Sequence, residues 1–382
     1  MPEMISYLES RQEYWKAMLR EMVEIESPSD DPAAVTRMAE WVADRVAPYA
    51  SVKFFPGGPF GKHLRCKFKL KGAPRDRRIL ALGHCDTVWP HGTLASMPFR
   101  EEDGKIYGPG TLDMKGGISF FLMAIEALRE LAIKPSASVS LLLVSDEEVG
   151  SLSSRPLTEA EASGAQLVLV LEPAFGQEGC LKTARKGTGM FRVRVDGKAS
   201  HAGIDFSAGA SAVTEISHQV LAIEKLTNLS KGVTVNPGVV RGGTKTNVVA
   251  AEAELLGDIR FWKTSDGEAV LRKLRSLRAR DPRCRLTVDG SLNRPALERT
   301  HEVRRAFQHA RAIARKLGFD LEEASTGGAS DGNFVSALGV PVLDGIGAVG
   351  DGAHAANEHL VARHMPQRAA LLAKLLADPL PF

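Results

Sequence analysis

The sequence lacks any long apolar run. No stretch of its 382 residues approaches the roughly 20 apolar residues that a membrane-spanning helix needs, which argues against an integral membrane protein. The amino terminus, MPEMISYLESRQEYWKAMLREM, is acidic and amphipathic and contains no apolar secretory core. Cysteine is scarce, and the four cysteines lie far apart in no spacing typical of a metal site: Cys66, Cys85, Cys180 and Cys284. We therefore expect reduced thiols in a cytoplasmic protein.

The sequence also lacks a strong charge of either sign. A net charge of +3 is nearly neutral for this length, and no stretch interleaves basic with aromatic residues, which argues against a nucleic-acid partner. A phosphate-binding loop is missing as well. The segment GPGTLD at 108–113 lacks the third glycine of the dinucleotide fingerprint, and nothing matches a P-loop with its GK[ST] ending. These absences count against a nucleotide-dependent enzyme.

What the sequence does contain is a series of short apolar runs that alternate with helical patterns. The runs at 77–83, 138–144, 166–171 and 341–347 are continuous, which is typical of buried strands in parallel sheets. Helical spacing of apolar residues between the first two runs completes a strand–helix–strand pattern. We therefore predict an α/β fold, a mostly parallel sheet with helices on both faces. One amino-terminal helix is expected to run to about Ile25.

A chain of this length exceeds the size of a single core, so two domains are expected. Residues 187–290 differ in pattern: a strictly alternating strand opens a β-α-β-β-α-β order, that of a ferredoxin-like α+β sandwich. We predict an inserted domain at 187–290, flanked by the two parts of the first domain at 1–186 and 291–382.

Side chains that bind metals follow all four apolar runs. They stand in the segments LGHCDTV, VSDEEVG, LVLEP and GDGAHAANE, as His84, Glu147, Glu148, Glu172 and His354. In open α/β sheets ligands bind beyond the carboxyl ends of the strands, so these side chains are expected at one edge. For any one of them alone a solvated loop charge is the simpler interpretation. Together they supply the nitrogen and oxygen ligands of a dinuclear metal site.

Asp113 stands in a glycine-rich turn, GPGTLDMKGG, that opens a helix. A carboxylate held there can bridge two metal ions, whereas beside a phosphate it would repel. His84 and Asp86 are two residues apart and point the same way in an extended segment, so Asp86 can orient the imidazole. The alternative is a capping aspartate beside a core histidine. Glu147 and Glu148 diverge, so one can bind metal while the other faces a bound water.

These motifs together resemble a known family. The order and spacing of HCDTV, GPGTLDMKGG, DEEVGS, LEP, GKASHAG, GGASDGNF and GAHAANE are similar to those of the dinuclear zinc exopeptidases of the carboxypeptidase G (glutamate carboxypeptidase) and aminoacylase family. The match covers nearly the whole chain. SRPL after DEEVGS and NRPAL after the insert resemble the glutamate carboxypeptidase branch most.

The resemblance implies a role for each residue. It makes Asp113 the bridging ligand, completes one site with His84 and Glu172, and completes the other with Glu148 and His354. It makes Glu147 the general base and Asp86 the residue that orients His84. The inserted domain would serve as lid and dimerisation surface. His201 in SHAG would reach the active site of the partner subunit and stabilise the oxyanion, unless it is merely a surface loop residue.

Four further residues would contact substrate in the family picture: Asn247, Arg260, Gly327 and Gly328. An arginine suits a substrate carboxylate because its fork binds both oxygens. The sequence departs from the family after Asn247, where a proline is common and Val248-Val249-Ala250 stands instead.

The resulting hypothesis is a metal-dependent hydrolase that cleaves an amide bond next to a free C-terminal carboxylate. Its substrate would be an N-acyl amino acid or short peptide that ends in glutamate or a similar residue. The alternative is an aminoacylase or desuccinylase-type deacylase that selects the acyl group. A non-catalytic protein of the same fold would lack a ligand or the base, and every position is filled. Two zinc ions are expected, although manganese or cobalt would suit oxygen-rich ligands, and the protein is expected to be a homodimer.

Overall fold

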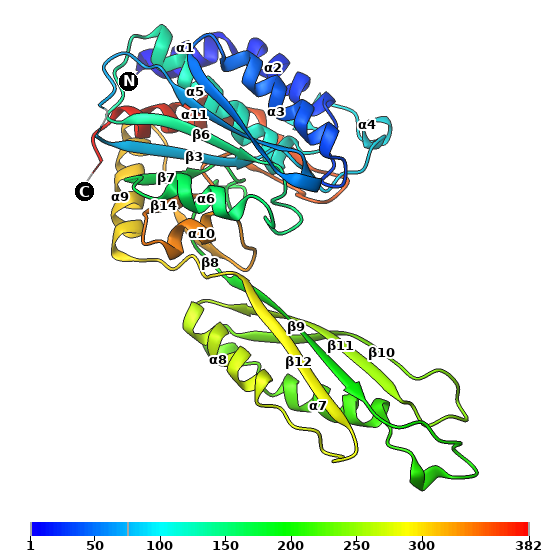
Figure 1. The fold of residues 1–382 in the computed structure, drawn as a ribbon. Helices are drawn as coiled ribbons and strands as arrows, with labels where there is room; N and C mark the ends of the chain where they lie inside the picture. Colours follow the sequence, from blue (N-terminus) through cyan, green and yellow to red (C-terminus); the bar gives the residue numbers. More distant parts are fainter. Residues whose placement is uncertain (1, 75, 381–382) are drawn as a thin grey trace. The chain divides into compact units, whose positions relative to one another are not determined.

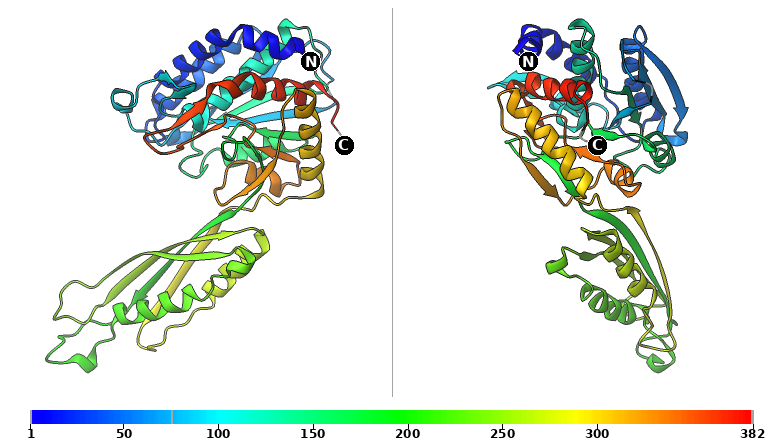
Figure 2. Two further views of the ribbon diagram at one scale, coloured as in Figure 1. Left: turned by 180° about the vertical axis from the view of Figure 1, so that it is seen from behind. Right: turned by 90° about the vertical axis from the view of Figure 1, so that its left-hand side faces the viewer.

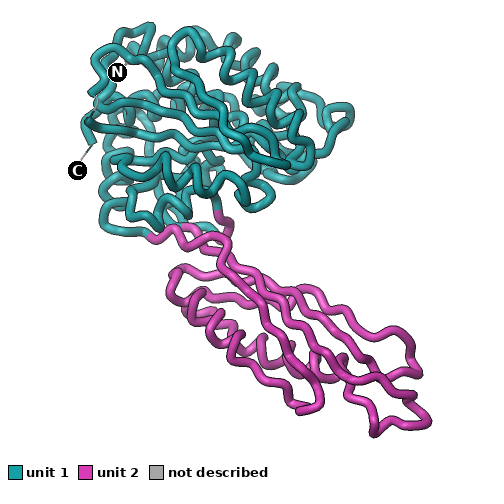
Figure 3. The backbone as a smooth tube through the Cα atoms, in the orientation of Figure 1, with its two compact units in different colours: residues 1–184, 299–326, 330–382 teal, residues 185–298, 327–329 magenta. Residues whose placement is uncertain are grey.

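The computed structural model describes residues 2–74 and 76–380 and divides the chain into two compact units. Unit 1 comprises Met1–Ala184, Arg299–Thr326 and Ser330–Phe382, and unit 2 comprises Arg185–Glu298 and Gly327–Ala329 (Figure 3). Each unit has a core of its own. No helix in the described part of the chain has the length and apolar character needed to cross a membrane.

Unit 1 is built on an eight-stranded sheet of order β1-β2-β6-β3-β7-β14-β8-β13 (Figure 1). Its four central strands, β6, β3, β7 and β14, run parallel, and β1, β2 and β8 are antiparallel to their neighbours. The bounds are β1 Ala50–Pro56, β2 Lys62–Phe68, β3 Arg78–His84, β6 Ser138–Val144, β7 Leu167–Val170, β8 Leu181–Arg185, β13 Glu323–Thr326 and β14 Val342–Asp344. The four predicted apolar runs are thus the parallel centre of the sheet, and the predicted fold class is confirmed.

Helices cover both faces of this sheet (Figures 1 and 2). Alternate residues of β3 divide between the faces: Ile79 and Ala81 belong to the core shared with the first group of helices, while Leu80 and Leu82 are buried on the other face. The first group is α1 Pro2–Ser10, α2 Gln12–Glu24, α3 Pro32–Val46, α5 Gly116–Glu130, α9 His301–Lys316 and α11 Met365–Ala377, and the second group is α6 Arg155–Ala162 and α10 Gly332–Ala337. A short helix, α4 Thr93–Ser96, lies in the loop after β3.

The prediction of a single amino-terminal helix is wrong. The segment forms two helices, because Arg11 between α1 and α2 has non-helical backbone angles (φ −114°, ψ 20°). The Ser10 hydroxyl donates to the Tyr7 carbonyl, which gives the backbone a local alternative to continuing the helix. The Arg11 guanidinium lies over the Tyr14 ring, 4.3 Å from its centroid, and so stabilises the break.

A small second sheet in unit 1 positions part of the site. Its order is β15-β16-β5-β4, with bounds β15 Gly350–Asp351, β16 His359–Val361, β5 Lys105–Tyr107 and β4 Arg100–Glu102. Strand β16 pairs antiparallel with β5, and Tyr107 lies opposite His359. The pairing therefore places the loop before β16 beside the turn after β5, although the two are far apart in sequence.

Unit 2 is a four-stranded antiparallel sheet of order β10-β11-β9-β12. Along the chain its elements are β9 Gly187–Asp196, α7 Ala212–Glu224, β10 Thr234–Gly242, β11 Glu252–Phe261, α8 Thr264–Arg275 and β12 Arg285–Arg294. Both helices pack on one face of the sheet (Figure 1). Strand β9 buries every second residue there, including Phe191, Val193 and Val195. The predicted ferredoxin-like order is confirmed.

Candidate active site

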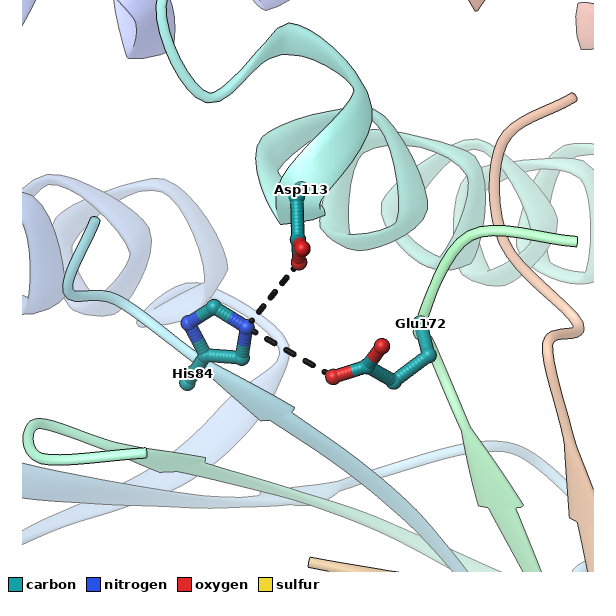
Figure 4. A group of neighbouring side chains, drawn as sticks. All are labelled: His84, Asp113 and Glu172. Carbon is teal, nitrogen blue, oxygen red and sulfur yellow. Dashed lines mark hydrogen bonds and ion pairs between the residues drawn. The ribbon is translucent and has the colours of Figure 1, made fainter. Parts of the chain in front are cut away.

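Three of the predicted ligands meet at the carboxyl end of the parallel strands. His84 is the last residue of β3, Glu172 follows β7, and Asp113 lies in the turn before α5. Nε2 of His84 lies 3.3 Å from Oδ1 of Asp113 and 3.7 Å from Oε1 of Glu172 (Figure 4). The three ligand atoms lie within 4.8 Å of one another. We call these three residues the first triad.

A second triad shares Asp113. Nε2 of His354 lies 3.5 Å from Oδ2 of Asp113 and 3.3 Å from Oε2 of Glu148, again with all ligand atoms within 4.8 Å. The two oxygens of Asp113 thus face two different histidines. His354 has a left-handed backbone (φ 62°), which is uncommon for a side-chain-bearing residue and is concentrated at functional sites.

Asp86 contacts residues of both triads. Nδ1 of His84 lies 2.9 Å from the Asp86 carbonyl oxygen and 3.4 Å from its carboxylate Oδ1. The buried carboxylate accepts hydrogen bonds from the backbone N–H of Glu147 (3.2 Å) and of Glu148 (3.1 Å), and from the Ser29 hydroxyl (2.9 Å). Asp86 therefore touches the histidine, as the sequence suggested, and also fixes the turn that carries the two glutamates.

The electrostatics show how strongly the carboxylates act on the histidines. Hydrogen bonds that the His354 imidazole donates to Asp113 and Glu148 raise its pKa to about 10. Burial opposes protonation of His84, but hydrogen bonds to Asp113 and Asp86 outweigh it, and its pKa is raised well above the usual range. Burial raises the pKa of Glu148. Each imidazole is therefore held where a positive charge is favoured.

The donor set fits divalent cations. Nδ1 of His84 faces the Asp86 oxygens, so it would donate to them when an ion displaces the proton from Nε2, and the Nε2 lone pair would then bind that ion. Oε1 of Glu148 is buried and has no hydrogen-bond partner among the described residues. One imidazole nitrogen with carboxylate oxygens at each triad is a ligand set that zinc accepts, and its oxygen content also suits manganese or cobalt.

Glu147 lies next to the triads without belonging to either. Its negative charge is among the influences that raise the pKa of His84, so its carboxylate lies close to the first triad. Glu147 and Glu148 leave the same turn, and only Glu148 enters a triad. The two adjacent carboxylates therefore differ in position, with Glu148 in the second triad and Glu147 beside the first.

The sequence reasoning missed Glu358. This residue is buried, 1% exposed, in the loop before β16. Its carboxylate accepts hydrogen bonds from the backbone N–H groups of Gly110, Leu112 and Asp113 and from the Trp89 indole. A glutamate one residue before a short strand carries no special pattern. Its position four residues after His354, in HAANE, was the available signal.

In unit 2 the structure brings His201 and Asn247 together. The Ala202 N–H donates to the Asn247 carbonyl (3.0 Å), and His201 pairs with Val248 as an isolated antiparallel bridge. The exposed His201 ring accepts hydrogen bonds at Nδ1 from the backbone N–H groups of Gly203 (3.1 Å) and Ile204 (3.2 Å). Because Nδ1 accepts, Nε2 carries the hydrogen and is a donor.

Arg260 lies elsewhere in unit 2. It pairs with Thr188 at the start of β9. Glu252 begins the opposite end of β11, roughly 25 Å from Arg260 along the strand, and Asn247 lies beyond Glu252. The guanidinium Nε of Arg260 donates to Asp258 Oδ1 at 2.9 Å. The turn that contains Gly327 and Gly328 is exposed and open: apart from the chain neighbours, no atom of the described residues lies within 4 Å of where a Cβ would stand. The predicted substrate-binding residues therefore form separate groups.

Comparison with known proteins identifies the family. The model of peptidase family M20/M25/M40 matches residues 80–378. The chain is 31% identical over 322 residues to carboxypeptidase G2 of Pseudomonas sp. (strain RS-16), across 83% of this chain and 77% of that protein. It is 28% identical over 311 residues to succinyl-diaminopimelate desuccinylase of Burkholderia multivorans, across 76% and 80%. The fold matches aminopeptidase PepT from Bacillus cereus with a TM-score of 0.79 at 23% identity, over 96% of this chain and 98% of that one. The resemblance found in the sequence is confirmed: the chain belongs to peptidase family M20/M25/M40, whose members are metal-dependent hydrolases.

Proposed function

We propose that this protein is a dinuclear metal-dependent carboxypeptidase or amidohydrolase that cleaves an amide bond adjacent to a free C-terminal carboxylate. It would release a C-terminal glutamate or similar amino acid from N-acyl amino acids or short peptides. The observation that carries the proposal is the pair of triads that share Asp113, with Glu147 on the same turn as a ligand.

In the proposed reaction His84, Asp113 and Glu172 would hold one ion, and Asp113, Glu148 and His354 would hold the other. A bound zinc ion, or manganese or cobalt in its place, would supply a Lewis acid for the carbonyl oxygen and would lower the pKa of water towards neutrality. The Glu147 carboxylate takes the proton from the attacking water and delivers it to the leaving nitrogen. The Asp86 carboxylate accepts a hydrogen bond from the backbone N–H of Glu147 and so keeps Glu147 in place.

We propose that His201 donates its Nε2–H to the oxyanion in the site of a partner subunit. The two hydrogen bonds that Nδ1 accepts support this role, because they leave Nε2 as the donor. A homodimer through the inserted domain is supported by apolar side chains that unit 2 leaves exposed: Ile204 (82%), Phe206 (69%) and Leu221 (59%). Contiguous exposed apolar patches mark association surfaces, and Ile204 and Phe206 lie in one exposed segment.

The proposed preference for an acidic C-terminal residue has support in unit 2, where basic residues outnumber acidic ones between 185 and 298. Such a surface attracts anionic substrates. Asn247, Arg260, Gly327 and Gly328 would contact the substrate, with Arg260 exchanging Asp258 for the terminal carboxylate. The four thiols are all free, as expected of a cytoplasmic protein.

The second candidate, a deacylase that selects the acyl group, is favoured by the desuccinylase relative. A hydrolysis screen separates the two. The screen assays two sets of substrates with zinc, manganese or cobalt: N-acyl derivatives of glutamate, aspartate and neutral amino acids, and N-succinyl and N-acetyl amines. The bound metal is quantified in the same preparations. Preference for a C-terminal acidic residue supports the proposal, whereas indifference to that residue with sharp choice of acyl group supports the deacylase. Hydrolysis unaffected by complete metal removal would refute both.

A further inference from the structure

Four N–H groups converge on the single buried carboxylate of Glu358. Oε1 accepts from the backbone N–H of Leu112 (2.8 Å) and of Asp113 (3.0 Å). Oε2 accepts from the backbone N–H of Gly110 (3.0 Å) and from Nε1 of Trp89 (2.6 Å). Two donors per oxygen satisfy a carboxylate well, and hydrogen bonds to a charged acceptor are stronger than neutral ones.

These hydrogen bonds provide acceptors for backbone N–H groups of the turn that carries Asp113. Asp113 and Met114 have non-helical backbone angles (φ −116°, ψ 95° and φ −133°, ψ 31°), so the turn departs from a regular helix just before α5. The N–H groups that enter such a turn lack partners within it. Glu358 supplies acceptors for three of them, and it is buried where water cannot substitute.

The same loop also delivers a ligand. His354 and Glu358 both lie in the segment 352–358 between β15 and β16, and Glu358 reaches the backbone of the aspartate that His354 faces. One loop thus contributes a side chain to the second triad and holds the residue that both triads share.

We propose that Glu358 is a positioning residue that fixes Asp113, and so sets the metal affinity of both triads. The proposal rests on the metal-dependent function above. It requires a carboxylate rather than a polar side chain of the same shape. In Glu358→Gln one acceptor oxygen becomes an NH2 group, and in either orientation that group faces two N–H donors.

The test compares Glu358→Gln with a matched control, Glu215→Gln. Glu215 in α7 is also 1% exposed and also accepts from two backbone N–H groups, those of Arg280 and Asp281 (both 2.9 Å), and from the Gln219 amide, but it lies in unit 2. Zinc affinity and stoichiometry are measured by competition with a chromogenic chelator, and the melting temperature is measured without metal.

Glu358→Gln is expected to weaken zinc binding about 10- to 100-fold, the range found when a partner of a metal ligand is removed. Because Asp113 is shared, both zinc ions should be affected. Glu215→Gln should lower the melting temperature and leave zinc affinity unchanged. Trp89→Phe removes only one of the four donors and serves if Glu358→Gln does not fold; it should weaken zinc binding to a smaller degree.

Wild-type zinc affinity in folded Glu358→Gln, or in Trp89→Phe if only that variant folds, would overturn the positioning role. An equal loss in Glu215→Gln would also overturn it, because the effect would then follow general destabilisation. If the wild-type protein binds no zinc, manganese or cobalt, the proposed function fails instead.

Discussion

Replacing Glu147 with glutamine tests the proposed general base with little other change. The side chain keeps its shape, and the backbone N–H of residue 147 keeps its hydrogen bond to Oδ1 of Asp86 (3.2 Å), so the turn should hold. Glu147 belongs to neither triad, so both metal ions should stay bound. What is lost is proton transfer. General base catalysis contributes roughly 10²- to 10⁴-fold, or about 2.7 to 5.5 kcal/mol of the activation barrier.

The assay measures kcat on the best substrate of the hydrolysis screen and the metal content of the same preparation. Glu147→Gln should lower kcat by the amount above with two metal ions per chain retained. Its matched control is the adjacent Glu148→Gln, which changes the same turn but removes a ligand of the second triad and should lower the metal content. If the kcat of Glu147→Gln stays within about threefold of the wild-type kcat, the assignment of Glu147 as the general base is refuted. Loss of metal from Glu147→Gln alone would refute the division of roles.

Three further predictions follow from particular contacts. In the metal-free protein the pKa of His354 is raised to about 10, above its unfolded value, so the stabilisation from its protonated form is complete below the unfolded pKa and is lost as the pH rises through 10. The difference in melting temperature between wild type and His354→Ala should therefore shrink over that window, and a constant difference would contradict the ion pairs. His201→Ala should lower kcat about 10²- to 10³-fold, as for removal of an oxyanion donor. In a two-fold dimer, mixing it with Glu147→Gln should restore about a quarter of wild-type activity, whereas no recovery would place His201 in its own subunit's site. Gly117→Ala should lower both the melting temperature and zinc affinity, because a Cβ at Gly117 would stand 1.8 Å from the Leu171 carbonyl oxygen, next to a ligand. Unchanged stability by thermal denaturation would contradict that close approach.

Much of the fold could be predicted because the decisive signal is local. The run 138–144 forms β6 residue for residue, because a short run that ends in four consecutive apolar residues is typical of a strand that is covered on both faces of its sheet. The edge strand β1 and its neighbour β2 were not predicted, because both mix charged with apolar residues. Strands of two or three residues, such as β15 and β16, are too short for any period to show.

The sequence by itself determined which residue types stand at the carboxyl ends of the strands. Once β3 and β7 are parallel neighbours, His84 and Glu172 must emerge at the same edge, because strand direction decides which end a following residue occupies. The candidate ligands could therefore be named from their places along the chain.

Only the tertiary structure decided how those residues meet and what holds them. It placed the two oxygens of Asp113 towards two different histidines. It also allowed the Asp86 carboxylate to accept hydrogen bonds from the backbone N–H groups of both glutamates, and Glu358 to accept one from the backbone N–H of Asp113. Each of these contacts joins segments that are distant in sequence. Hydrogen-bond partners of this kind depend on the packing of whole elements, which no local pattern of residues encodes.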